Sequence, residues 1–176
     1  MQQQGRARRR RTRLDSHGLV GFQASAVRTL QSHVGSAACQ LELFRKNLGD
    51  DGVATLAAAA ASGSLCNLEQ LELSGNKIGD AGMAHLSRAI ASGSLAALKE
   101  LYLYNNLIGD AGMAELSRVV ARGSLGALTR LYLYTNQIGD AGVAHLSRAI
   151  ASGSLGNLNM LELQGNQIGD GGIAEL

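Results

Sequence analysis

The sequence repeats itself with a period of thirty residues. The strings LELFRKNLGDDGVATL, LELSGNKIGDAGMAHL, LYLYNNLIGDAGMAEL, LYLYTNQIGDAGVAHL and LELQGNQIGDGGIAEL begin at positions 41, 71, 101, 131 and 161. Linkers of the form ASGSLxxL, or ARGSLGAL at 121–128, lie between them. A regular period of this length is typical of a solenoid, in which no unit buries its apolar face alone and about three or more must stack.

Each unit predicts a short strand followed by a helix. Leu71 and Leu73 alternate with a polar residue, which is the pattern of a strand with one buried face. Asn76 follows at a turn, and its equivalents are predicted to form a column of buried amides that satisfy backbone groups. Asp80 is predicted to be the N-cap of the helix, and Gly93 is predicted to end it. The same positions recur as Asn106, Asn136 and Asn166, and as Asp50, Asp110, Asp140 and Asp170.

Stacked units predict a parallel sheet with helices on its other side. Strands lie about 4.8 Å apart, whereas packed helices need about 8–10 Å. The stack is therefore expected to bend, with parallel strands on the concave face and helices on the convex face. Gly82 recurs as Gly112, Gly142 and Gly172, and because glycine weakens a helix, its recurrence predicts close packing against the neighbouring unit. The predicted fold class is α/β, a curved horseshoe segment of a solenoid.

The repeating pattern LxxLxLxxNxIGDxGxxxL resembles the leucine-rich repeat of the ribonuclease-inhibitor type. The match runs through Leu68, Leu71, Leu73, Asn76, Ile78, Gly82, Leu86 and Ile90, and the repeats cover residues 41–176. The IGDAG form is similar to the repeats of nucleotide-binding innate-immunity receptors and of Ran GTPase-activating proteins. The resemblance implies a leucine-rich-repeat solenoid whose usual task is protein binding.

Three segments are expected along the chain. They are a basic, disordered tail at 1–20, a degenerate N-terminal unit or cap at 21–40, and leucine-rich repeats at 41–176, the last of them truncated. In the first repeat Lys46 takes the Asn place and Asn47 comes one position late, which predicts a distorted unit or a cap. The chain stops at Leu176, within a helix and without a polar closing unit, so we expect a fragment of a longer protein.

The units differ most at the strand positions that point away from the core. One column reads Glu42, Glu72, Tyr102, Tyr132, Glu162, the next reads Phe44, Ser74, Tyr104, Tyr134, Gln164, and the preceding one reads Gln40, Gln70, Glu100, Arg130, Met160. All four tyrosines of the chain thus share one face. Exposed tyrosines beside Arg and Glu fit a protein-binding hot spot, and cross-strand tyrosine pairs also fit simple stabilisation of the sheet. We expect a protein partner to contact Phe44, Glu72, Glu100, Tyr102, Tyr104, Arg130, Tyr132, Tyr134 and Glu162.

The charge is concentrated at the N-terminal end. Arg6, Arg8, Arg9, Arg10, Arg11 and Arg13 are six of the sixteen basic residues, so the rest of the chain has ten basic against fourteen acidic residues. A mildly acidic body argues against nucleic-acid binding. The Arg-rich head is compatible with a nuclear-localisation signal, a nucleic-acid patch, a targeting segment or a disordered tail.

The cysteine count and the lengths of the apolar runs bear on where in the cell the protein is located. Cys39 and Cys66 are too few for a zinc cluster or a disulfide framework, and they are interpreted as two buried, reduced thiols. The sequence has no apolar run long enough to span a membrane and no stretch that resembles a signal peptide. These features favour an intracellular protein, cytoplasmic or nuclear.

The sequence predicts no catalytic residues, no metal site and no cofactor. The Gly-Asp-Ala-Gly runs lack the lysine of a phosphate loop and recur in successive units. On the helices, His85, Glu115, His145 and Glu175 share one repeat position, which predicts a solvated charge ladder with Arg88, Arg118 and Arg148 one turn away. We therefore expect a non-enzymatic module that binds a protein partner on its concave strand face, with no small-molecule substrate. The alternative is an activator of a small GTPase, with Arg130 or Lys46 reaching the nucleotide.

Overall fold

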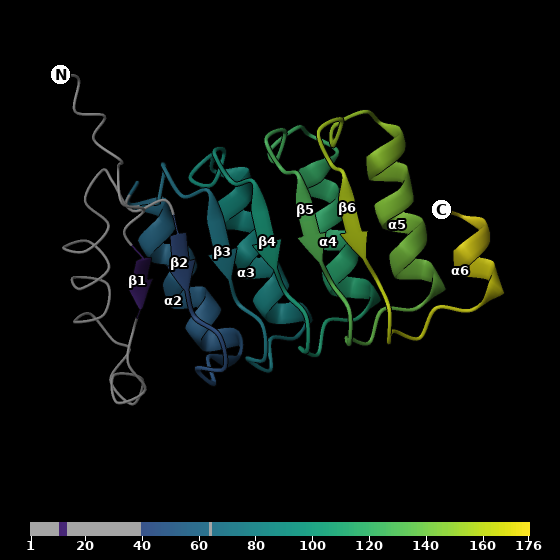
Figure 1. The fold of residues 1–176 in the computed structure, drawn as a ribbon, viewed down its shortest axis with the longest axis horizontal. Coiled ribbons are helices and arrows are strands. Elements are labelled where there is room, and N and C mark those ends of the chain that lie inside the picture. Colours follow the sequence, from purple (N-terminus) through teal and green to yellow (C-terminus); the bar gives the residue numbers. More distant parts are fainter. Residues whose placement is uncertain (1–10, 14–39, 64) are drawn as a thin grey trace, which may run out of the picture.

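The computed structural model describes residues 11–13, 40–63 and 65–176. Its described strands form one parallel sheet in sequence order: β1 (Arg11–Arg13), β2 (Gln40–Glu42), β3 (Gln70–Glu72), β4 (Glu100–Tyr102), β5 (Arg130–Tyr132) and β6 (Met160–Glu162). The described helices are α2 (Gly49–Ala61), α3 (Asp80–Ala91), α4 (Asp110–Val120), α5 (Asp140–Ala151) and α6 (Asp170–Ala174). Figure 1 shows the strands as one layer and the helices as a second layer behind it.

The register of the sheet confirms the predicted solenoid. Leu71 pairs with Leu101, and Leu101 pairs with Leu131, so each strand lies beside the residue thirty positions later. These three leucines are fully buried between the sheet and the helices. The closer spacing of strands than of helices makes the sheet the concave layer. Within the described residues, no helix is both long enough and apolar enough to cross a membrane.

The predicted column of buried amides is confirmed, and it joins neighbouring repeats. The Asn106 Oδ1 accepts the backbone N–H groups of Asn76 (2.9 Å) and Ile78 (3.0 Å). Its Nδ2 donates to the carbonyl of Leu103 in its own repeat and to that of Leu73 in the repeat before. Asn76 and Asn136 are also buried, whereas Asn166 at the end of the stack is half-buried. One side chain thus satisfies turn backbone groups that lie beyond the ends of the short strands.

The prediction that each aspartate caps its own helix is wrong. Helix α4 has Gly109 as its N-cap, with no hydrogen bond from a side chain of its own repeat, and Asp110 is its first helical residue. The acceptor comes from the preceding repeat, since the Asp80 Oδ1 accepts the N–H groups of Gly109 (2.8 Å) and Gly112 (2.9 Å). The carboxylates of Asp50, Asp110 and Asp140 make the same forward contact, because the next helix begins beside each of them with unsatisfied amides.

The recurring helix glycine is explained by this forward contact. A Cβ atom added at Gly112 would lie 2.7 Å from the Asp80 Oδ1, and one added at Gly142 would lie 2.5 Å from the Asp110 Oδ1. Any side chain would push the carboxylate away from the amides that it accepts. The predicted close packing at this position is confirmed, and its partner is the aspartate of the preceding repeat.

In the loops that follow the helices, the predicted glycine stop is confirmed and the predicted burial of a cysteine is wrong. Gly93 follows the end of α3 with a φ of +81°, the left-handed conformation expected of a glycine stop. Cys66, predicted to be buried, is exposed and free. It lies between Leu65 and Leu68, which both point into the core, so its own side chain faces outward. Cys39 lies outside the described residues.

The N-terminal side of the stack differs from the prediction at three positions. Within the segment expected to be a tail, Arg11–Arg13 form strand β1, which pairs in parallel with β2 at an offset of 29 residues. An edge strand has unpaired backbone groups, so a preceding segment at nearly the repeat spacing can pair with it. The other residues of the expected tail, and 21–39 of the expected cap, lie outside the described part of the chain.

The first full repeat accepts Lys46 in the Asn place with a local change. The Lys46 N–H still donates to the Asn76 Oδ1 at 2.8 Å, and β2 keeps its register with β3. Helix α2 begins at Gly49, one residue earlier in the repeat than α3. The distortion is therefore confined to the turn and the helix start.

We predict that Asp110→Ala lowers the free energy of unfolding by about 0.5–2 kcal/mol, the range measured for lost N-cap side chains. The substitution removes the acceptor of the Gly139 N–H (2.7 Å) and the Gly142 N–H (2.9 Å). Urea unfolding followed by circular dichroism measures the change. The matched control is Asp170→Ala, since Asp170 is exposed and accepts no hydrogen bond among the described residues. Equal losses for the two variants would contradict the forward capping.

Candidate functional site

The candidate site is the strand face, which comprises the outward residues of β2–β6 and the residues that directly follow each strand. Inward leucines alternate with these positions, so the strand pattern fixes which side chains reach the surface. The register places Glu72 beside Tyr102, Tyr102 beside Tyr132, and Tyr132 beside Glu162. The three columns expected from the sequence are therefore present on one face.

The four tyrosines form two stacked pairs. The ring centroids of Tyr102 and Tyr132 lie 4.5 Å apart with an interplanar angle of 7°, and those of Tyr104 and Tyr134 lie 4.4 Å apart at the same angle. Each tyrosine is half-buried. Stacked aromatic pairs contribute about 0.5–1.5 kcal/mol beyond their area burial, so the block stabilises the sheet while part of each ring stays accessible.

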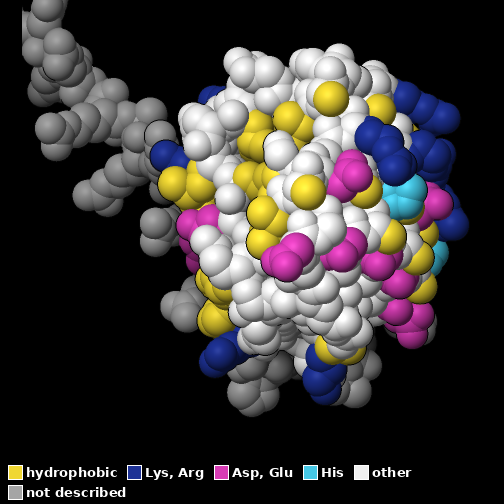
Figure 2. Space-filling model, turned by 90° about the vertical axis from the view of Figure 1, so that its right-hand side faces the viewer, with side chains coloured by type: hydrophobic (Ala, Val, Ile, Leu, Met, Phe, Trp, Pro, Cys, Tyr) yellow, Lys and Arg dark blue, Asp and Glu magenta, His cyan; other side chains and the backbone are white. Residues whose placement is uncertain are grey.

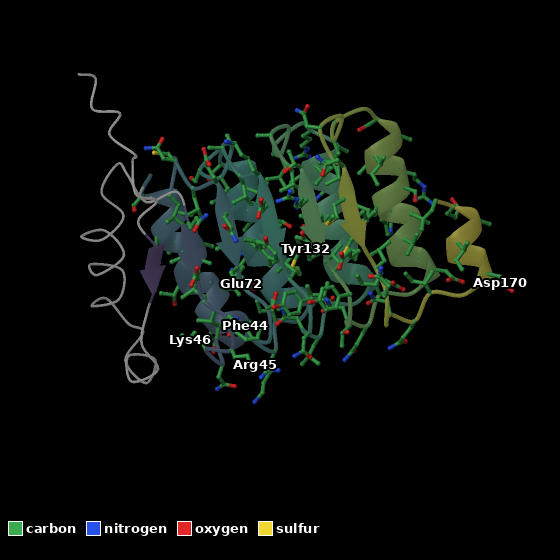
Figure 3. All side chains as sticks on the ribbon, viewed as in Figure 1. Phe44, Arg45, Lys46, Glu72, Tyr132 and Asp170 are labelled. Atoms are coloured by element: carbon green, nitrogen blue, oxygen red, sulfur yellow. The ribbon has the colours of Figure 1, made fainter. Side chains whose placement is uncertain are left out.

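Phe44 extends the aromatic block across β3. Its ring centroid lies 6.1 Å from that of Tyr104, although Ser74 separates them in the column. The side chain of Ser74 is small, so the two rings meet above it. Ser74 is completely buried as a result. Figure 3 shows Phe44 near Glu72, with Tyr132 farther along the sheet.

Arg45 belongs to this surface, and the sequence analysis did not select it. Its guanidinium carbon lies 5.0 Å from the centroid of the Phe44 ring, a cation–π distance. Arg45 has a φ of +51°, and its Cγ would lie 2.7 Å from a Cβ added at Gly75. Glycine at position 75 thus lets the arginine side chain cross the next strand end. The sequence does contain a signal for this contact, since Arg45 in one repeat has Gly75 at the equivalent position of the next repeat.

Glu100 connects the tyrosines to the single arginine of the three columns. The Tyr102 hydroxyl donates to the Glu100 Oε2 at 2.6 Å, and the Arg130 Nη1 donates to the Glu100 Oε1 at 2.5 Å. Both oxygens of the carboxylate are therefore engaged. The Arg130 side chain is exposed and the Glu100 side chain is half-buried, so the pair orients side chains more than it stabilises the fold.

Burial and neighbouring carboxylates shift several titration equilibria on the strand face. Burial raises the pKa of the Glu72 carboxyl, and the Glu42 carboxylate on the neighbouring strand raises it further, against the opposing hydrogen bonds from Ser74. Burial also raises the pKa of the Tyr102 hydroxyl, as does its hydrogen bond to Glu100. The pKa values of Tyr104 and Tyr134 are raised mainly by burial. The raised pKa values keep Tyr102, Tyr104 and Tyr134 as neutral hydrogen-bonding groups.

The nine predicted site residues lie together on the strand face, whereas Lys46, the other basic residue considered for a GTPase activator, lies apart from Arg130. Contacts or adjacent register positions join Phe44, Glu72, Glu100, Tyr102, Tyr104, Arg130, Tyr132, Tyr134 and Glu162. Arg130 begins β5, whereas Lys46 follows the opposite end of β2, so these two basic residues do not converge. Among the described residues, no group of three His, Cys, Asp or Glu side chains is arranged to hold a metal ion.

We predict that the free energy of unfolding falls as the pH rises above about 10, and that Tyr102→Phe reduces this fall. An unfolded tyrosine ionises near pH 10, whereas the folded Tyr102 has a higher pKa. Its contribution to stability is therefore complete below that pH and is lost as the unfolded chain ionises. Urea unfolding at pH 8 and pH 11 measures the two slopes. Identical pH dependence in the two proteins would count against this assignment.

Comparisons with known proteins agree with the repeat architecture. The family model described as Leucine Rich repeat matches residues 64–87 and 157–176. No curated protein matches the sequence. Among solved structures, an internalin (inlF) from Listeria monocytogenes is 22% identical, with a TM-score of 0.38, over 71% of this chain and 41% of that chain.

Two further structures show similarity of the same order. The leucine-rich-repeat ectodomain of the Arabidopsis thaliana receptor kinase GASSHO1/SCHENGEN3 is 17% identical, with a TM-score of 0.36, over 77% of this chain and 19% of that chain. Internalin C2 from Listeria monocytogenes is 21% identical, with a TM-score of 0.28, over 85% of this chain and 86% of that chain. This chain spans less than half the length of the inlF and GASSHO1/SCHENGEN3 chains. With its thirty-residue register, parallel sheet and alternating helices, the described part of residues 40–176 has the leucine-rich-repeat solenoid fold.

Proposed function

We propose that this chain is a non-enzymatic protein-binding module whose partner lies against the strand face. The observation that carries the proposal is the half-buried tyrosine block, whose stacked rings stand among carboxylates on an otherwise regular scaffold. Rigid aromatic groups with polar tips are favoured at the centres of protein interfaces, because they add contact area with little loss of conformational entropy. Leucine-rich-repeat solenoids commonly serve as interaction modules, which supports the same reading.

The repeat subtype forms part of this proposal. We assign the repeats to the ribonuclease-inhibitor type, supported by the thirty-residue period and by full helices of 11–13 residues on the convex side. This assignment concerns the shape of the scaffold and names no partner.

The alternative function, activation of a small GTPase, needs a basic side chain that is free to reach the nucleotide. The Arg130 guanidinium is engaged by Glu100 on the neighbouring strand, and Lys46 lies at the other end of the strands. This geometry favours the binding module. A GTP-hydrolysis assay with a panel of small GTPases decides between the two, since stimulated hydrolysis would select the activator.

We predict that the double variant Tyr104→Ser, Tyr134→Gln loses its partner, with recovery at least about tenfold lower, as expected for hot-spot residues. Both replacements occur naturally in the same column, at Ser74 and Gln164, so the sheet accepts them. Proximity labelling in cells that express the full chain, followed by quantitative mass spectrometry, measures the recovery. Circular dichroism and urea unfolding verify that the variant is folded.

The matched control changes the opposite face. His85→Glu on α3 introduces the residue that occupies the equivalent position on α4, Glu115, and it is expected to leave partner recovery unchanged. A folded strand-face variant that keeps the partner, or a loss caused by His85→Glu, would refute binding through the strand face.

A further inference from the structure

A groove lies on the convex side, between helices α4 and α5. Its volume is about 390 Å³, and three alanines, Ala114, Ala121 and Ala149, contribute to its lining. Charged side chains complete it, with Glu115 and Arg118 on α4 and His145 and Arg148 on α5. Figure 2 shows Lys and Arg side chains gathered beside a His on the helix side of the molecule. A mostly apolar hollow with a few polar groups is the usual form of a ligand site.

A small side chain on α5 lines the groove at its buried side. Position 149 is an alanine, whereas the equivalent position of the preceding helix is Val119. Both residues are at least 97% buried, with exposed fractions of 3% and 1%. Helix α3 also has an alanine at this position, Ala89, so among α3, α4 and α5 the larger side chain is found on α4. A valine at position 149, as on α4, is therefore expected to fill part of the groove.

The side chains of His145 and Arg148 on α5 also differ in their contacts from the equivalent side chains on α3 and α4. On α3 the Arg88 Nη1 lies 3.2 Å from the His85 Nδ1, within hydrogen-bond distance, and on α4 Arg118 forms an ion pair with Glu115. Among the described residues, the side chains of Arg148 and His145 have no hydrogen bond or ion pair. Each arginine stands in the last turn of its helix, where it complements the helix dipole, so position alone does not distinguish Arg148. What distinguishes Arg148 is that its side chain has no side-chain partner among the described residues, whereas Arg88 contacts His85 and Arg118 contacts Glu115.

A buried hydroxyl group also lines the groove, at a repeat position where the equivalent Ser87 and Ser147 hydroxyls likewise have no hydrogen-bond partner among the described residues. Ser117 lines the groove and is 5% exposed, yet its Oγ has no hydrogen-bond partner within the described structure. A buried hydroxyl without a partner is unfavourable, because it has lost its hydrogen bonds to water. A ligand oxygen in the groove would accept from this hydroxyl and remove the cost.

We propose that the α4–α5 groove binds a small organic anion, with one carboxylate or phosphate head and a short apolar body. Arg148 supplies a planar fork of donors to the head, and Ser117 supplies a hydroxyl donor. The apolar body lies over the alanines. Glu115 already neutralises Arg118, so the groove holds a surplus of about one positive charge and suits a single anionic head. The site is one of binding without reaction, and it is separate from the strand face.

The test is an NMR titration of the full ¹⁵N-labelled chain with phenyl phosphate, which has both an anionic head and an apolar ring. We expect saturable shifts centred on α4 and α5, with a dissociation constant on the order of 1 mM for so small a probe. Inorganic phosphate, which lacks the ring, is expected to bind more weakly. Arg148→Gln is expected to weaken phenyl phosphate binding by about tenfold or more, as for loss of a charged hydrogen bond.

The decisive variant is Ala149→Val, which copies the residue of α4 and fills the groove without altering charge. It is expected to abolish the saturable shifts while the rest of the spectrum stays that of the folded protein. Arg88→Gln on α3 is the charge-matched control and is expected to leave binding unchanged. Shifts that do not saturate, equal sensitivity to Arg88→Gln and Arg148→Gln, or normal binding by folded Ala149→Val would each overturn the proposal.

Discussion

The solenoid depends on one buried side-chain amide in each repeat. Each strand is three residues long, so the backbone of the following turn has few sheet partners. Asn106 accepts two N–H groups of the preceding repeat and donates to carbonyls of both repeats. A buried polar group left unpaired costs about 1–3 kcal/mol, and several such groups depend on this one side chain. The same amide therefore closes its own turn and holds the neighbouring repeat.

Each interface between repeats combines this backward contact with a forward one. At the interface of β3 and β4, Asn106 reaches back to Ile78, and Asp80 reaches forward to the start of α4. Neither repeat satisfies all of its backbone N–H groups with acceptors of its own. Gly112 belongs to the same arrangement, because its missing side chain leaves space for the Asp80 carboxylate. The fold consequently exists only as a stack, and its stability is a sum of nearest-neighbour interfaces.

Much of this could be predicted from the sequence because the thirty-residue period reports directly on packing. Leu71, Asn76 and Gly93 occupy the places that their chemistry predicts. The forward direction of the Asp80 carboxylate could not be predicted, because capping of its own helix and capping of the next helix leave the same local pattern. The sequence predicted that the four tyrosines lie on one face of the sheet. It could not predict that their rings stack, because stacking depends on side-chain geometry. The contact of Phe44 with Tyr104 across Ser74 required three-dimensional packing.

Since leucine, asparagine, aspartate and glycine specify the scaffold, the remaining positions are free to differ on both faces.

Hydrogen exchange of the Asn76 and Ile78 amides, compared between the natural chain and Asn106→Ala, tests the role of the buried amide most directly. We predict slow exchange in the natural chain and marked acceleration at both amides in the variant, with no such change in the exposed neighbour control Leu107→Ala. Unchanged protection in folded Asn106→Ala would contradict the dependence of the stack on this side chain.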